Sequence, residues 1–430
     1  MALKEDEGLL KRRAAWQLPP RPQWASDLNA LGSKLDIGGI VPLDENSLVD
    51  AARRNTGLDD FEEDGWREHF RLLLKSIDED AALNFVGRIL TRSDILGYLE
   101  ARLRVVDAYK RHPEIDQEVV KEPVFILGFG RSGTTILHET LSQDPQFRSV
   151  QRWEALFPDG RPDADQAEIN HWIAKAQDRV DFVHALSPEW KSMHAWGGDL
   201  PVEDIEFTYL AFFSEVWATA MNVQSYESYF NSQDPAYHFH WHTKVLKLLQ
   251  WGHPKRHWLL KNPTHMPRIP QLLKAYPDAK IILPHRDPIA SSDSVTNVGG
   301  TIFSWRTDDI YGSKSTGREW AALDGRIKMW DDVINWIEDG TLREGNYANS
   351  VYTQFMEAPE DAIREIYSSL RLELTPEATD RMLTFLKSRH GQSHGNSSKY
   401  KKSQTDDPVI QAERANYARY QSYFNVPNEI

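Results

Sequence analysis

The segment from Pro123 to Leu137, PVFILGFGRSGTTIL, constrains the fold of this chain more than any other stretch. Its apolar run from Val124 to Leu127 predicts a strand buried on both faces of a parallel sheet. Three closely spaced glycines follow, and the hydroxyl residues after them open a predicted helix that ends near Leu141. Together, the strand, the glycine turn and the helix N-terminus predict an anion site, because backbone N–H groups and the helix dipole point to one place.

The turn has the glycine spacing of the triphosphate-binding loop G-x-x-x-x-G-K-[ST] between Gly128 and Gly133. Thr134 stands where that loop has its lysine, and the nearby cation is Arg131 instead. The site therefore suits a single terminal phosphate or a phosphosulfate better than a triphosphate with magnesium. An ordinary strand-to-helix turn is the alternative interpretation of the same residues.

Composition narrows the class of protein further. The chain has 430 residues, a formal net charge of −14 and no cysteine. The missing cysteines exclude a disulfide scaffold, a thiolate metal site and a cysteine nucleophile. The acidic balance argues against non-specific nucleic-acid binding and requires a local basic cluster for any anionic ligand. We expect no transmembrane segment and a cytoplasmic location, because the apolar runs are short and the N-terminal segment lacks a signal-peptide core.

The chain divides into three predicted regions. The first region, residues 1–120, is predicted to be an N-terminal arm followed by a helical lobe. Residues 1–43 are proline-rich and expected to be extended, and residues 44–111 have helical periodicity. Residues 121–402 form the predicted core, with an aromatic helical insertion at about 160–256. Residues 403–430 form a C-terminal tail. The insertion is typical of a lid or an acceptor pocket, although core packing explains most of its tryptophans equally well.

Cations follow two further buried strands of the predicted sheet. Residues 257–260 and 280–284 are short apolar runs, and they lead to Lys261 and Arg286. Ligands of open parallel sheets bind at the carboxyl ends of the strands. We therefore expect Lys261 and Arg286 to converge with Arg131 and to form the basic cluster that an acidic chain needs.

Glu154 follows a predicted strand over Phe147–Gln151, so it is expected near the same edge, where a carboxylate could act as a general base. A solvated or salt-bridged glutamate is the alternative. His194 precedes an acidic stretch, Asp199–Asp204.

The histidines at positions 238, 240 and 242 alternate, which is a pattern that metal ligands also show. Because no carboxylate partner stands at ligand spacing, we predict no metal site.

The stretches GFGRSGTT and RDPIASSDS together resemble the sulfotransferases that use 3′-phosphoadenosine-5′-phosphosulfate (PAPS). More narrowly, the chain is similar to bacterial members whose first motif reads G-x-x-R-S-G-T-T. The resemblance implies an α/β fold of three layers, with a mostly parallel central sheet flanked by helices. This core is similar to that of the P-loop NTPases, and an N-terminal helical lobe precedes it.

The resemblance also assigns roles to residues. It places the 5′-phosphosulfate on the first loop, at Gly130, Arg131, Ser132, Gly133, Thr134 and Thr135. It places the 3′-phosphate on Arg286 and on Ser294, eight residues later. Lys261 and Arg131 would stabilise the transferring group, and Glu154, or else His194, would be the catalytic base. Lys399 and Tyr400, in a glycine-, serine- and lysine-rich loop, would close over the 3′-phosphate, unless this loop is only a charged surface segment.

The implied activity is in-line transfer of the sulfuryl group from PAPS to a hydroxyl or an amine, without a metal. The acceptor would be a small molecule, a lipid or a glycan, and a homodimer is an assembly that the sequence leaves open. Two other classes fit the same core: a nucleotide kinase, which the missing lysine disfavours, and a binding protein without catalytic activity.

Overall fold

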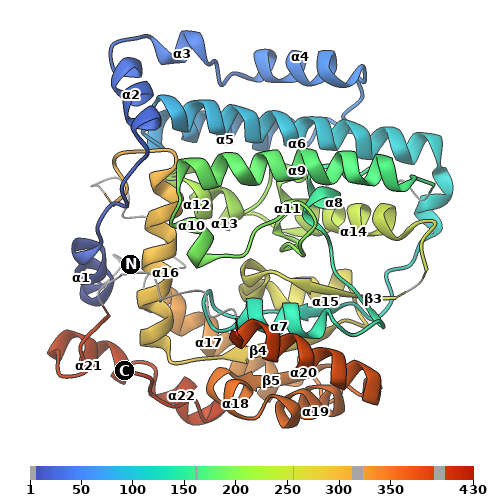
Figure 1. The fold of residues 1–430 in the computed structure, drawn as a ribbon, viewed down its shortest axis with the longest axis vertical. Coiled ribbons are helices and arrows are strands. Elements are labelled where there is room, and N and C mark those ends of the chain that lie inside the picture. The colour runs from blue at the N-terminus through green and yellow to red at the C-terminus, as the bar shows by residue number, and fades with distance from the viewer. Residues whose placement is uncertain (1–5, 160–162, 255, 312–322, 392–401) are drawn as a thin grey trace.

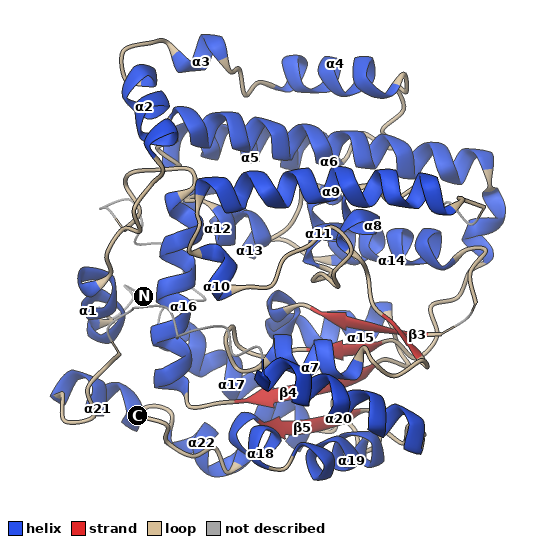
Figure 2. Cartoon of the chain, in the orientation of Figure 1, coloured by secondary structure: helices blue, strands red, loops and turns tan. Residues whose placement is uncertain are grey.

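A five-stranded parallel sheet forms the centre of the computed structural model, which describes residues 6–159, 163–254, 256–311, 323–391 and 402–430. Its strand order is β2-β3-β1-β4-β5, and every neighbouring pair is parallel, as the sequence predicts. Figure 2 shows these strands in red in the lower half of the molecule. The strands are β1 (Val124–Ile126), β2 (Phe147–Arg148), β3 (His257–Lys261), β4 (Lys280–His285) and β5 (Tyr347–Val351).

The register of the central strands brings their ends to one edge of the sheet. Ile126 of β1 pairs with Lys261 of β3 and with Ile282 of β4. Because β3 ends at Lys261, its side chain lies beside the turn that follows β1. Strand β1 is also the topological switch point of the sheet, because β2 and β3 lie on one side of it in the strand order and β4 and β5 on the other. Open parallel sheets bind ligands at such points.

Helices cover both faces of the sheet and complete the predicted three layers. Val124 and Ile126 face one layer, whereas Phe125 and Leu127 face the other. The first layer contains α7 (Thr134–Leu141), α19 (Pro359–Ser369) and α20 (Pro376–Gly391). The second contains α14 (Ala236–Gln250), α15 (Ile269–Ala275) and α17 (Leu323–Glu338).

The N-terminal helical lobe has the predicted character, and Figure 1 shows it away from the sheet. Its helices are α4 (Glu45–Thr56), α5 (Trp66–Asp80) and α6 (Phe85–Arg111), followed by the 3-10 turn η1 (Pro113–Gln117). Arg102 of α6 is fully buried and donates to the carbonyl oxygens of Phe61 (3.0 Å) and Leu210 (2.9 Å). Its guanidinium also lies 3.9 Å from the ring centroid of Trp241. This arginine therefore joins the lobe to the insertion.

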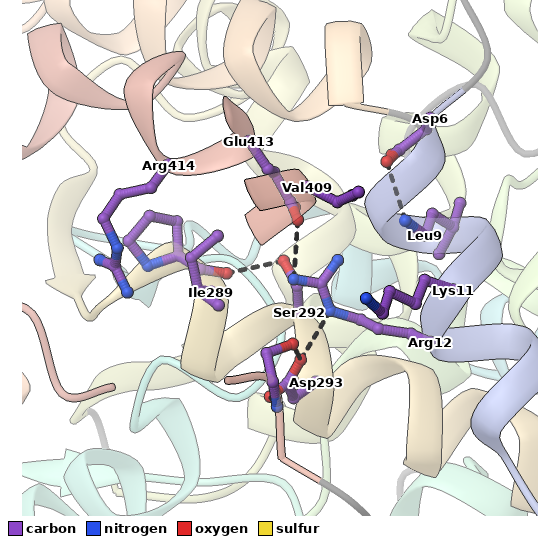
Figure 3. A network of polar contacts seen from close by, with 12 residues as sticks. Asp6, Leu9, Lys11, Arg12, Ile289, Ser292, Asp293, Val409, Glu413 and Arg414 are labelled. Carbon is purple, nitrogen blue, oxygen red and sulfur yellow. Dashed lines mark hydrogen bonds and ion pairs between the residues drawn. The ribbon is translucent and has the colours of Figure 1, made fainter. Parts of the chain in front are cut away.

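The prediction of an extended arm over residues 1–43 is wrong, because helices form there. They are α1 (Glu7–Ala15), α2 (Gln23–Gly32) and α3 (Ile37–Ile40). Figure 3 shows Arg12 of α1 pointing at Asp293 of α16 (Pro288–Ser304), with Nε 2.6 Å from Oδ1. Arg12 also pairs with Glu413 of α21 (Pro408–Ala415) at 2.8 Å. Partners so far along the chain leave no trace in the local sequence.

The insertion is helical, as predicted, and the tail is helical too. The insertion contains α9 (Gln166–Leu186), α10 (Trp190–Met193), α11 (Ile205–Thr208), the 3-10 turn η2 (Tyr209–Ala211), α12 (Val216–Ala220) and α13 (Gln224–Asn231), and then α14. The remaining elements are α8 (Arg152–Leu156), the 3-10 turn η3 (Pro263–Arg268), α18 (Tyr352–Glu357) and α22 (Ala418–Phe424). Within the described ranges, no helix combines the length and the apolar character that a bilayer crossing requires.

Candidate active site

A cavity of about 1010 Å³ opens at the carboxyl edge of the sheet. One wall comes from the glycine turn and the strand ends, with Gly130, Arg131, Gly133, Thr134, Thr135, Lys261 and Arg286. Apolar side chains from the lobe, the insertion and the segment around α16, here called the apolar wall, also line the cavity, namely Leu90, Val180, Trp190, Met193, Trp196, Trp217 and Trp305. Charged side chains of the same regions, among them Arg152, Arg179 and Glu206, line it as well. An apolar lining with a set of placed polar groups is the usual composition of a small-molecule site.

The glycine turn adopts the backbone that an anion site needs. Arg131 and Gly133 have positive φ angles of 69° and 96°. A Cβ atom on Gly133 would lie 2.6 Å from Cδ2 of Tyr352, so no side chain fits there. Ser132 is buried, and its hydroxyl has no hydrogen-bond partner among the described residues. Its Oγ would lie 2.7 Å from a Cβ atom on Gly128, and Ser132 is not among the described residues that line the cavity.

The structure brings Arg131, Arg286 and Ser294 together. Arg131 Nε donates to Ser294 Oγ at 3.0 Å, and Arg286 Nη1 donates to the carbonyl oxygen of Arg131 at 3.1 Å. The guanidinium of Arg286 lies over the ring of Tyr352, 4.2 Å from its centroid. The cationic end of the cavity is thus assembled from the turn after β1 and from the segment that links β4 to α16.

Lys261 stands between the turn and a carboxylate that the sequence interpretation left without a role. Its Nζ lies 3.1 Å from Thr135 Oγ1 and 2.7 Å from Oε1 of Glu203, which lines the cavity. Burial raises the pKa of Glu203, but its interactions with Lys261 and His194 together outweigh this effect, and the net pKa is lowered. Glu203 is therefore an ionised carboxylate beside the lysine. The acidic pair Glu203-Asp204 is the feature of the sequence near this position that suggests a functional carboxylate. The neighbouring residues do not show that Glu203 contacts Lys261.

His194 also lines the cavity, as a neutral base. Burial, followed by the charge of Lys261, lowers its pKa to about 3. Its Nδ1 lies 3.3 Å from the carbonyl oxygen of Ala195, and its ring stacks on Trp190 at 5.8 Å. With Nδ1 donating to that carbonyl, Nε2 is the nitrogen that can accept a proton.

The structure does not bring Glu154 to this cluster. Its Oε2 accepts from the backbone N–H of Gln151 at 2.9 Å, in the capping box of α8, and its Oε1 pairs with Arg148 at 2.5 Å. Among the described residues, it is not part of the cavity wall. The reason is the length of β2, which ends at Arg148 opposite Trp258, so the chain turns into α8 before it reaches the end of β3.

The alternating histidines do not gather in one place. On α14, His238 and His242 are buried, whereas His240 is exposed on the other side of the helix. His242 instead joins His265 at Asp204, whose Oδ2 lies 2.7 Å and 3.0 Å from their Nε2 atoms. These three ligand-type side chains are buried and close enough for a metal ion. Their contacts are nevertheless ordinary hydrogen bonds that satisfy both Nε2 atoms, so we assign no ion to them.

Lys399 and Tyr400 lie outside the described residues. The described geometry is that of an α/β protein with a glycine turn between a strand and a helix, in which Arg131, Lys261, Arg286 and Glu203 line one cavity together with apolar side chains.

The chain belongs to the sulfotransferase family, because the model described as "Sulfotransferase family" matches residues 123–376. Among curated proteins it is similar to the omega-hydroxy-beta-dihydromenaquinone-9 sulfotransferases Stf3 of Mycobacterium bovis and Mycobacterium tuberculosis. The identity to each is 24% over 271 residues, which cover 59% of this chain and 64% of the relative. The match therefore spans less than two thirds of the length of these relatives.

Two solved structures share the fold over most of their length. Sulfotransferase STF9 from Mycobacterium avium is 25% identical with a TM-score of 0.75, covering 90% of this chain and 97% of that one. Sulfotransferase STF1 from Mycobacterium tuberculosis H37Rv is 23% identical with a TM-score of 0.72, covering 87% and 98%. Since the shared fold exceeds the family-model range, it extends beyond the core.

Proposed function

We propose that this protein transfers the sulfuryl group of PAPS to a hydroxyl group of an acceptor with an apolar body. The observation that carries the proposal is the shared cavity wall of Arg131, Lys261 and Arg286 beside the glycine turn. In a chain with a net charge of −14, three cations around a preformed anion turn favour an anionic ligand at this one place.

The donor would lie along the polar wall. The turn from Gly130 to Thr135 would hold the 5′-phosphosulfate through backbone N–H groups and the N-terminus of α7. Arg286 and Ser294 would hold the 3′-phosphate, which is the group that distinguishes PAPS from adenosine 5′-phosphosulfate. Both residues contact Arg131, Arg286 at its carbonyl oxygen and Ser294 at its Nε, and this proximity supports a shared ligand.

Glu203 would be the general base, and Lys261 the charge that stabilises the transferring group. The contact of 2.7 Å between them supports the assignment, because it places an ionised carboxylate next to the cation that would face the sulfuryl group. In-line transfer needs the acceptor oxygen opposite the leaving phosphate, so positioning and charge carry most of the catalysis. His194, which is neutral and lines the same cavity, is the alternative base.

The acceptor would lie along the apolar wall. Trp190, Trp196, Trp217 and Trp305 all contribute to it, which suits a lipid-like or aromatic body better than a sugar. The mycobacterial relatives are named for an omega-hydroxy-beta-dihydromenaquinone-9 acceptor. We therefore propose a hydroxyl at the end of an apolar molecule as the group that is sulfated.

The test is transfer of labelled sulfuryl from PAPS to a panel of apolar, phenolic and sugar alcohols, with an Arg286→Ala variant as the control for the donor site. Arg286→Ala should weaken PAPS binding by about 2 kcal/mol, the lower range for losing a charge partner, because this arginine is partly exposed. It should hardly change binding of adenosine 5′-phosphosulfate. Equal losses for both ligands would remove the 3′-phosphate assignment, and sulfation of sugars alone would contradict the proposed acceptor class.

A further inference from the structure

Glu429, near the C-terminal end of the described residues, forms hydrogen bonds with Arg286, the arginine that we assign to the 3′-phosphate. Arg286 Nε donates to Glu429 at 2.8 Å (Oε1) and 3.1 Å (Oε2), and Nη2 donates to Oε2 at 2.7 Å. Such a two-pronged pair between guanidinium and carboxylate fixes direction as well as charge.

Glu429 contacts Arg286 without being one of the described residues that line the cavity. Arg286 and Tyr352 both line the cavity, whereas Glu429 is not among its described lining residues. The carbonyl oxygen of Arg131 and the ring of Tyr352 hold the guanidinium at two other positions. Within the described part of the chain, three partners therefore orient the guanidinium before any donor arrives.

Contacts with the residues on either side of Arg286 hold Glu429 and the C-terminal segment in place. The backbone N–H of Glu429 donates to Asp287 Oδ2 at 2.7 Å, and Asp287 is fully buried at the N-cap of α16. The ring of Phe424, also buried, stacks on His285 at 4.0 Å. Arg414 of α21 donates to the Asp287 carboxylate at 3.1 Å and 3.2 Å. The tail is thus seated on the three consecutive residues His285, Arg286 and Asp287.

We infer that Glu429 is a positioning residue for the donor's 3′-phosphate, an inference that rests on the proposed function. An unrestrained arginine loses side-chain entropy when it binds a phosphate. Glu429 moves this cost from ligand binding to folding. It therefore sets how strongly the enzyme prefers a nucleotide with a 3′-phosphate over one without it.

The experiment measures calorimetric affinity for adenosine 3′,5′-bisphosphate and adenosine 5′-phosphate in the full chain and two variants. Glu429→Ala should weaken the bisphosphate about tenfold and change the monophosphate by less than about twofold, because only the 3′-phosphate uses the oriented arginine. Glu429→Gln keeps one acceptor oxygen and should lie between the two. Arg419→Ala is the matched control, since it removes the contact of 3.0 Å between α22 and Asp331 of α17 without touching Arg286.

Three outcomes would overturn the inference: an unchanged preference in both Glu429 variants, tighter bisphosphate binding, or an equal loss in Arg419→Ala. Tighter binding would mean that the carboxylate competes with the phosphate, and an equal loss would mean that tail packing alone matters. If Glu429→Ala does not fold, the Gln variant decides by the same comparison. An unmodified protein that binds both nucleotides equally would instead contradict the 3′-phosphate site of the proposed function.

Discussion

Lys261 and Glu203 form an ion pair of 2.7 Å at the cavity wall, although 58 positions separate them in the chain. The same ammonium lies 3.1 Å from Thr135 at the start of α7. The lysine therefore connects the proposed base to the proposed phosphosulfate site. An anion bound at the turn would compete with Glu203 for this cation, which would free the carboxylate to take a proton when the donor is in place.

Glu203→Gln should lower kcat by roughly 10²–10⁴-fold, because a general base contributes about that much. Donor affinity should stay level or rise slightly, since Lys261 loses a competing carboxylate. Acceptors with a more acidic hydroxyl should partly restore the rate because they need less help in losing the proton. Steady-state kinetics with acceptors of graded acidity measure this effect.

Glu154→Gln is the matched control for that experiment, because it makes the same change in the carboxylate of the α8 capping box. It should keep full activity and nearly full helix capping, because glutamine also completes a capping box, so that only the ion pair with Arg148 is lost. If Glu203→Gln is fully active and acidic acceptors rescue His194→Ala instead, the base is His194.

Lys261→Ala should also lower kcat, but for a different reason. It removes positive charge from the transferring group, and the loss of one such stabilising contact typically costs about 10²–10³-fold. Acidic acceptors should not restore this rate, since proton removal is not what has been lost. A Lys261→Ala variant that acidic acceptors rescue as well as Glu203→Gln would show that the lysine acts only through Glu203.

Gly133→Ala should destabilise the fold and weaken donor binding together. Its φ of 96° is unfavourable for alanine, and the new Cβ would push into Tyr352, the ring beneath Arg286. Gly340→Ala is the matched control, because Gly340 has a φ of 79° and no atom within 4 Å of the new Cβ. Backbone strain of this kind costs about 1–3 kcal/mol, so urea unfolding should show a loss for both variants and a larger one for Gly133→Ala. If both variants lose the same stability and Gly133→Ala binds the donor as well as the unmodified protein, the turn only connects β1 to α7.

Buried histidines should make the protein sensitive to acid. Burial, as the largest cause, lowers the pKa of His138, His194, His238 and His285 to about 4, 3, 3 and 4. An unfolded histidine titrates near pH 6.5, so below about that pH the unfolded chain binds protons that the folded chain does not. The free energy of unfolding should therefore fall as the pH drops from about 6.5 toward 4, by up to about 1.4 kcal/mol per unit for each histidine.

Urea unfolding at pH 7.5, 6.0 and 5.0 measures this slope. His238→Phe should flatten it, because both ring nitrogens of His238 are buried without a partner among the described residues. His240→Phe, on the exposed side of the same helix, should leave the slope as it is. A slope that His238→Phe does not change would show that this histidine titrates alike in the folded and unfolded states.

Prediction from the sequence succeeded where neighbours in the chain determine the structure. The run from Val124 to Leu127 and the glycines after it specify a buried strand and a left-handed turn, because apolar burial and glycine's freedom act over a few residues. The predicted strands before Lys261 and Arg286 form for the same reason. These elements place the cationic wall of the cavity almost entirely, since parallel strands bring their carboxyl ends to one edge.

Only the tertiary structure decided which side chains from distant segments pair with each other. Glu154 stands close to the turn in sequence, yet the short strand β2 leaves it capping α8 beside Arg148. Glu203 reaches Lys261, and Glu429 reaches Arg286 from 143 residues away. Helix α1 of the N-terminal segment carries Arg12, which contacts Asp293 of α16. An ion pair depends on where two charges meet in space and on how little water surrounds them, and a chain read residue by residue carries neither quantity.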